Sequence, residues 1–182
     1  MKLLSFIFFA VLIIGCKTNK NVVTNSIISD TINQNKSEKQ LQTICPENGK
    51  CTTTIFRNQS LDIKTDEFGS IYYEKIDNPN TSVILFSYSR NVPKGVQDAG
   101  YREEIVFEIN NSDKNISLAN DQLQQTKMLY GRFCFCKGKT GNFAVTAGQL
   151  NLKQIGKKVQ FDLQFKNNKV PQLLSFIAEV VL

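Results

Sequence analysis

Over most of the chain after position 44, apolar and polar residues alternate with a period of two. The stretch VQFDLQF at 159–165 is the clearest example, because every second residue in it is apolar. In EEIVFEI at 103–109, Glu104 and Glu108 fall on the face opposite Ile105. Such alternation is typical of β-strands with one buried and one solvated face. It predicts strands for this part of the chain.

Clusters of Gly, Asn, Asp and Pro separate the alternating segments and are expected to form turns. They leave about nine expected strands, near 52–57, 60–65, 70–76, 82–90, 103–110, 126–137, 143–153, 158–166 and 174–182. One or two helical turns are expected near Asn120–Gln125, with Asn120 as the N-cap. The stretch NNSDKNISLAND at 110–121 is expected to be a polar loop. The pattern as a whole predicts an all-β protein, an antiparallel β-sandwich or barrel-like fold of about eight to nine strands with little helix.

The first residues of the chain follow a different pattern. An almost continuous apolar run, 3–14, lies behind Lys2 and ends at Gly15. A membrane-spanning helix needs about 20 apolar residues, so this run is too short to cross a bilayer and is typical of a secretory signal peptide. The residues IIGC at 13–16 resemble the lipobox of bacterial lipoproteins. The resemblance implies cleavage before Cys16 and acylation of its thiol and new amine, as with palmitate; an ordinary secretory leader is the alternative.

The segment that follows predicts a flexible tether. Residues 17–42 contain no aromatic residue, Gly or Pro, and their apolar pairs fit neither a helix nor a strand. We therefore divide the chain into a signal peptide at 1–15, a lipidated cysteine with a polar tether at 16–43, and one all-β domain at 44–182. Within the tether, DTI at 30–32 resembles the O-glycosylation acceptor motif of Bacteroidota and makes Thr31 a candidate acceptor, with chance as the alternative.

Composition excludes several kinds of site and partner. The chain has no His, which removes Ser-His-Asp and Cys-His catalysis and His-ligated zinc. Without Lys2, 21 basic residues face 16 acidic ones, a charge of +5, and the basic residues are dispersed. This dispersal argues against a nucleic-acid partner. The abundance of Asn, Lys and Ile, together with the lipobox, resembles lipoproteins of Bacteroidota.

Four cysteines remain inside the domain. Cys45 and Cys51 flank the loop PENGK and are expected to form a disulfide, as is typical of exported proteins. Cys134 and Cys136 are two residues apart, so in a regular strand they could bond only if the strand bends. Cross-bridges between the two pairs, reduced thiols and a C-x-C redox pair stay open as alternatives. A metal site is disfavoured because C-x₅-C and C-x-C differ from the usual zinc spacing, and we expect neither a metal nor a cofactor.

The sequence nominates no catalytic residues and one candidate binding loop. The triplet GKT at 138–140 lacks the preceding glycine of a phosphate-binding loop. The longer connection at 89–103 carries Arg90, Lys94, Tyr101 and Arg102, and long loops on rigid sheets often bind partners. A solvated crossover between sheets is the alternative.

These features lead to one expected function and one alternative. We expect a lipid-anchored protein of the bacterial cell envelope with a non-catalytic binding or accessory role, acting through an envelope protein or a glycan. By resemblance to the enterobacterial sorting rule, lysine rather than aspartate at position 17 favours the outer membrane. No acidic run follows Cys16, which favours a domain that faces the periplasm; surface exposure is the alternative location. The alternative function is an envelope hydrolase that uses Asp, Glu or Lys residues.

Overall fold

Strands make up most of the described part of the chain. The structure, a computed structural model, describes residues 45–96, 98–156, 158–174 and 176–177. The elements within these residues are β1 (Gly49–Thr65), β2 (Ile71–Arg90), β3 (Tyr101–Asn110), β4 (Asn115–Ala119), the 3₁₀ helix η1 (Asn120–Thr126), β5 (Leu129–Cys134), β6 (Gly141–Ala144), β7 (Gly148–Ile155), β8 (Lys158–Phe165) and β9 (Phe176–Ile177). The predicted all-β, antiparallel fold class is confirmed. The expected signal peptide, Cys16 and the tether with Thr31 lie outside the described residues.

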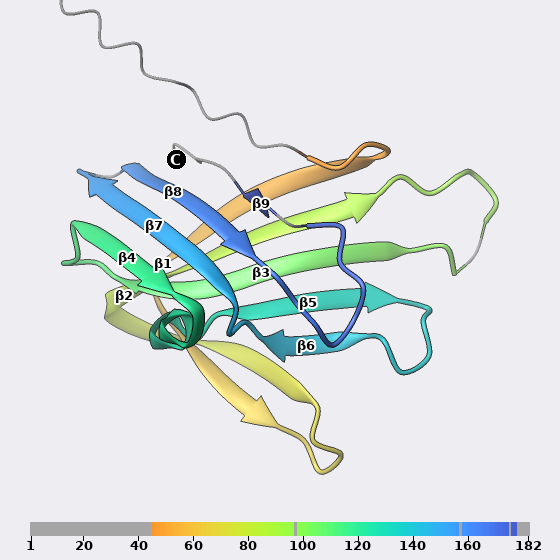
Figure 1. The fold of residues 1–182 in the computed structure, drawn as a ribbon, viewed down its shortest axis with the longest axis horizontal. Coiled ribbons are helices and arrows are strands. Elements are labelled where there is room, and N and C mark those ends of the chain that lie inside the picture. Colours follow the sequence, from red (N-terminus) through yellow and green to blue (C-terminus); the bar gives the residue numbers. More distant parts are fainter. Residues whose placement is uncertain (1–44, 97, 157, 175, 178–182) are drawn as a thin grey trace, which may run out of the picture. The chain divides into compact units, whose positions relative to one another are not determined.

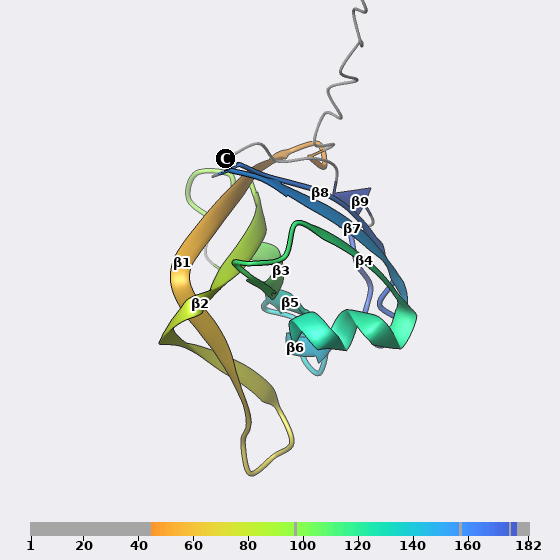
Figure 2. The same ribbon diagram turned by 90° about the vertical axis from the view of Figure 1, so that its left-hand side faces the viewer.

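The strands form two antiparallel sheets that face each other (Figures 1 and 2). The first sheet has the order β1-β2-β3-β5-β6, and the second has the order β4-β7-β8-β9. The long strand β2 also reaches β6, where Ile71 pairs with Asn142. This extra pairing closes β2, β3, β5 and β6 into a ring, so the first sheet is barrel-like.

Each face of the first sheet covers its own hydrophobic core. Between the two sheets lies the larger core, in which the rings of Phe107 and Phe161 meet edge to face with centroids 5.5 Å apart. On the opposite face, inside the ring, Leu61 packs with Val83 and other apolar residues in a smaller core. Both sides of β3 are therefore buried, with Ile105 in the larger core and Val106 in the smaller one.

A bulge in β1 makes the smaller core possible. Asn58 has φ +58°, and the pairing of β1 with β2 shifts between Arg57 and Gln59. One extra residue reverses which face the following side chains occupy. Leu61 and Ile63 consequently point into the smaller core instead of away from it.

Several expected element boundaries were wrong. The expected strands 52–57 and 60–65 are one strand, β1, and 70–76 and 82–90 are one strand, β2. The turn-forming residues between them make a bulge and a corner within continuous strands, not hairpin turns. The expected strand 126–137 is shorter and spans Leu129–Cys134. Within the expected strand 174–182, the structure describes the short strand β9 at Phe176–Ile177.

The chain also crosses between sheets where one strand was expected. The expected strand 143–153 leaves the first sheet after Ala144 and enters the second at Gly148. Gly148 has φ +146°, and a Cβ there would lie 2.2 Å from the carbonyl oxygen of Gln164. Periodicity cannot reveal this crossing because both halves alternate in the same way.

The expected polar loop at 110–121 was partly wrong, because it contains β4. Short helical structure follows as expected, as η1, but its N-cap is Ala119, and Asn120 itself has φ +52°. In β8, Phe161 and Phe165 are buried and Gln164 is exposed, as the alternation predicted. Gln160 is half-buried.

Candidate functional site

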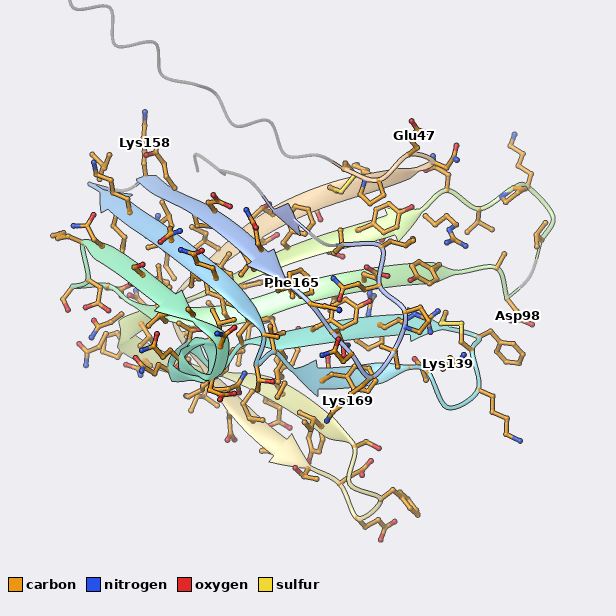
Figure 3. The ribbon with its side chains drawn as sticks, viewed as in Figure 1. Glu47, Asp98, Lys139, Lys158, Phe165 and Lys169 are labelled. Carbon is orange, nitrogen blue, oxygen red and sulfur yellow. A yellow bond between two sulfur atoms is a disulfide. The ribbon has the colours of Figure 1, made fainter. Side chains whose placement is uncertain are left out.

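Three connections gather at one end of the first sheet. They are the segment at 45–48 before β1, the β2–β3 loop at 91–100 and the β5–β6 loop at 135–140. The strand register puts them together, because Gly49 pairs with Arg90, Tyr101 with Cys134, and Arg132 with Gly141. We call these three connections the loop end. In Figure 3, Glu47, Asp98 and Lys139 mark it, and Lys158 lies at the opposite end of the strands.

Of the four residues of the candidate binding loop, only Arg90 and Tyr101 contact each other. The Arg90 guanidinium lies 4.4 Å from the centroid of the Tyr101 ring. Arg102 points to the other face of β3, where its Nε lies 3.0 Å from Oε1 of Glu104 and its guanidinium lies 4.5 Å from the Phe133 ring. Lys94 is exposed in the loop. Arg90, Tyr101 and Arg102 thus belong to strand ends, and the loop itself spans 91–100.

A buried polar cluster lies beneath the loop end. Glu103, with 0% of its surface exposed, accepts a hydrogen bond from the Tyr101 hydroxyl. The same hydroxyl accepts one from Nε of Arg132 at 3.3 Å. Burial, followed by the hydrogen bond to Glu103, raises the pKa of Tyr101. The pKa of Tyr130 is also raised, by burial and then by the charge of Glu103.

The C-terminal part of the domain seals this cluster. The Glu103 carboxylate accepts hydrogen bonds from the backbone N–H of Leu173, at 2.8 Å to Oε1, and of Leu174, at 2.7 Å to Oε2. With the Tyr101 hydroxyl, these donors occupy both carboxylate oxygens. Glu103 therefore has no access to a substrate and acts as an attachment point for the segment 173–174.

Sequence reasoning missed Glu103, although a signal was present. In the strand 103–109 it falls on the same face as Ile105 and Phe107, so an acidic residue lies on the apolar face. A carboxylate at such a position requires partners. The backbone donors that satisfy it come from residues 70 and 71 positions later, beyond the reach of a local pattern.

Glu104 and Glu108 do not form a catalytic pair with Glu103 either. Glu104 points to the smaller core, where burial raises its pKa against the opposing effect of Arg102. Glu108 borders an open cleft of about 530 Å³ together with Asp113. Both oxygens of Glu108 are engaged: Oε2 accepts from Ser60 Oγ and the Leu61 N–H at 2.7 Å each, and Oε1 lies 2.9 Å from Lys127 Nζ. This carboxylate holds β1 against β3.

The described residues contain no metal-ligand cluster, and their cysteines are paired. Cys45 is bonded to Cys51, with the Cα atoms 5.8 Å apart. Cys134 is bonded to Cys136, with the Cα atoms 5.2 Å apart. The second bond forms because β5 ends at Cys134 and the chain then bends, which is the condition that the sequence required for it.

The surface of the loop end combines apolar and basic side chains. Phe135 is 86% exposed, and Val92 and Val96 are 43% and 50% exposed. The exposed charged residues around them are Lys50, Arg90, Lys94, Lys137 and Lys139, against Glu47 and Asp98. The loop end therefore carries exposed apolar side chains together with a net positive charge.

Comparisons with known proteins give no match. No protein-family model matches the sequence, and no curated protein and no solved structure is significantly similar to it. Within the described part of the chain, no helix has the length and hydropathy needed to cross a bilayer.

Proposed function

We propose that this protein is a lipid-anchored component of a bacterial cell envelope that works as a non-catalytic binding module, with the loop end as its binding face. The leader and lipobox-like residues support anchoring through Cys16. The tether then holds the domain at a membrane surface, with outer-membrane attachment on the periplasmic side as the proposed location.

The observation that carries the binding role is the exposed surface of the loop end. Exposed apolar residues that cluster on one face commonly mark interaction sites. Phe135, Val92 and Val96 supply that apolar area, and Lys94 and Lys137 supply positive charge beside it. A protein partner with an apolar patch and acidic residues is complementary to this surface. The partner is therefore proposed to be an envelope protein.

The two adjacent carboxylates of β3, Glu103 and Glu104, do not favour the alternative of an envelope hydrolase. The most deeply buried carboxylate, Glu103, is sealed by backbone donors. Glu104 faces the opposite side of the same strand and pairs with Arg102. Two carboxylates that point in opposite directions cannot act on one bond.

Site-specific crosslinking tests the binding face. A photoreactive residue at Val96 or Phe135 of the anchored protein is expected to form a discrete protein adduct in cells. The control is the same residue at Gln149, which is exposed on the second sheet. Lys94→Glu combined with Lys137→Glu should abolish the adduct because the charge complementarity reverses. The same adduct from the protein with the photoreactive residue at position 149 would contradict the loop end as the binding face. An adduct that persists in the charge-reversal variant would also contradict it.

Anchoring is tested separately with Cys16→Ala. The variant is expected to be released or mislocalised and to fail to mature as a lipoprotein, since the acyl acceptor is absent. One acyl chain binds a membrane only marginally, whereas two or more bind it stably, so the loss should be nearly complete. Mass spectrometry that finds no acyl group on wild-type Cys16 would show the proposal of a lipid anchor to be wrong.

A further inference from the structure

The disulfide between Cys134 and Cys136 lies where a strand gives way to an exposed loop. Cys134 is the last residue of β5, and Cys136 donates its backbone N–H to the Cys134 carbonyl oxygen at 2.8 Å. Cys134 packs against the larger core. Cys136 lies between two exposed residues, Phe135 and Lys137. Both cysteines are half-buried, so the bond lies at the boundary between the core and the exposed loop.

The β5–β6 hairpin is held together by other contacts. Thr140 Oγ1 donates to the Arg132 carbonyl oxygen at 2.9 Å, and Arg132 Nη1 donates to the Lys139 carbonyl oxygen at 2.6 Å. The Lys139 N–H donates to the Cys136 carbonyl oxygen at 3.0 Å. In the chain-entropy description a disulfide stabilises less as the loop that it closes becomes shorter, and this one joins residues only two apart. The bond is therefore dispensable for holding the hairpin.

The surroundings of the bond favour attack by a thiolate. The two cysteines border a cleft of about 470 Å³ with Phe135, Lys137 and Thr140. The positive charges of Lys137 and Lys139 attract an incoming thiolate and stabilise the thiolate that leaves. Phe135, at 86% exposed, offers an apolar contact for a polypeptide beside the reacting sulfur.

We propose that Cys134–Cys136 is a redox-active disulfide that accepts electrons from a protein dithiol. A thiolate of the dithiol attacks Sγ of Cys136, a mixed disulfide forms, and the S–S bond to Cys134 breaks with Cys134 leaving as a thiolate. The second thiol of the partner, deprotonated, then attacks the mixed disulfide and releases Cys136 as a thiolate. The partner loses two electrons and two protons and becomes a disulfide, and Cys134 and Cys136 gain them as two thiols.

The disulfide Cys45–Cys51 provides an internal control. The full-length protein in detergent is equilibrated with graded mixtures of reduced and oxidised glutathione, its thiols are trapped by alkylation, and each cysteine pair is quantified by mass spectrometry. We expect Cys134–Cys136 to be half-reduced at a ratio of reduced to oxidised thiol at least about tenfold lower than the ratio for Cys45–Cys51. Half-reduction of both pairs at the same ratio would overturn the proposal.

Two sets of variants separate a redox role from a structural one. Cys134→Ser with Cys136→Ser is expected to keep the wild-type circular dichroism spectrum and to lose oxidation of a reduced dithiol peptide; an unfolded variant would show the bond to be structural and the proposal wrong. Lys137→Gln with Lys139→Gln should slow the oxidation of the same peptide by about threefold or more, since it removes both adjacent charges. The control, Lys166→Gln with Lys169→Gln, should leave that rate unchanged. An unchanged rate in the first pair would contradict the role of the two lysines.

Discussion

Glu103 and Glu104 are neighbours in the sequence with opposite surroundings. Glu103 faces the larger core and is fully compensated by hydrogen bonds from Tyr101, Leu173 and Leu174. Glu104 faces the smaller core, where Nε of Arg102 lies 3.0 Å from its carboxylate and Ser87 and Lys75 also favour its charged form. The strand alternation alone predicts that the two carboxylates point apart, because neighbouring residues of a strand occupy opposite faces.

The burial of Glu104 predicts that the stability of the domain depends on pH in a specific way. Burial raises the pKa of Glu104 above the usual 4.5, so the folded state binds this proton more tightly than the unfolded state does. Protonated Glu104 therefore contributes to the free energy of unfolding below pH 4.5, and this contribution is lost as the pH rises through the higher pKa of the folded state. Glu104→Gln should therefore become progressively more stable relative to wild type between pH 4 and pH 8, measured as urea midpoints. A difference between the two proteins that is constant with pH would contradict the raised pKa.

At the scale of elements, the alternation identified most strands and misjudged their ends. It found the buried face of β8, with Phe161 and Phe165, because that strand has one wet face. The alternation predicted two separate strands in place of β1 and two in place of β2, because Asn58 and the stretch Asp77–Asn80 are residues that favour turns. Local turn chemistry does not distinguish a bulge from a hairpin; the pairing of the whole strand decides which of them forms.

The bulge at Asn58 yields a prediction about β1. Asn tolerates a positive φ better than β-branched residues do, and left-handed backbone costs an ordinary residue roughly 1–2 kcal/mol. Asn58→Val should therefore lower the free energy of unfolding by about that amount, and Asn58→Gly should change it little. Chemical denaturation followed by circular dichroism measures both. Equal losses in the two variants would show that the Asn58 side chain, and not its backbone angle, matters.

At the scale of the whole molecule, the two cores and the segment at 167–174 must come together. Val170 and Leu174 pack in the larger core, and the N–H groups of Leu173 and Leu174 meet Glu103. None of this is visible in the sequence, because an apolar stretch does not reveal which distant acid its backbone will satisfy. The loop end, too, was only partly predicted. The sequence indicated a loop at 89–103, which the structure shortens to 91–100, but it did not place the loop at 135–140 beside it.

A double-variant comparison tests the seal over Glu103. In the full chain, Glu103→Ala should lower the free energy of unfolding by about 3 kcal/mol, since two buried N–H groups lose their acceptor. In a full-length chain that also carries Leu173→Pro and Leu174→Pro, the same substitution should cost less than about 1 kcal/mol because those N–H groups are absent. The measurement is urea denaturation of the four proteins. An equal cost in both chains would mean that Glu103 acts through other contacts.

The bond between Glu103 and residues 173–174 also bears on when the domain can fold. During synthesis, β3 leaves the ribosome about 70 residues before the amides that will satisfy its carboxylate. Until then, closing the two sheets would bury a charge without these partners. Contacts between distant segments slow folding in general, and this one defers it until nearly all of the domain has been made. For the exported protein proposed above, such late folding would suit passage through a translocation channel, which admits extended polypeptide.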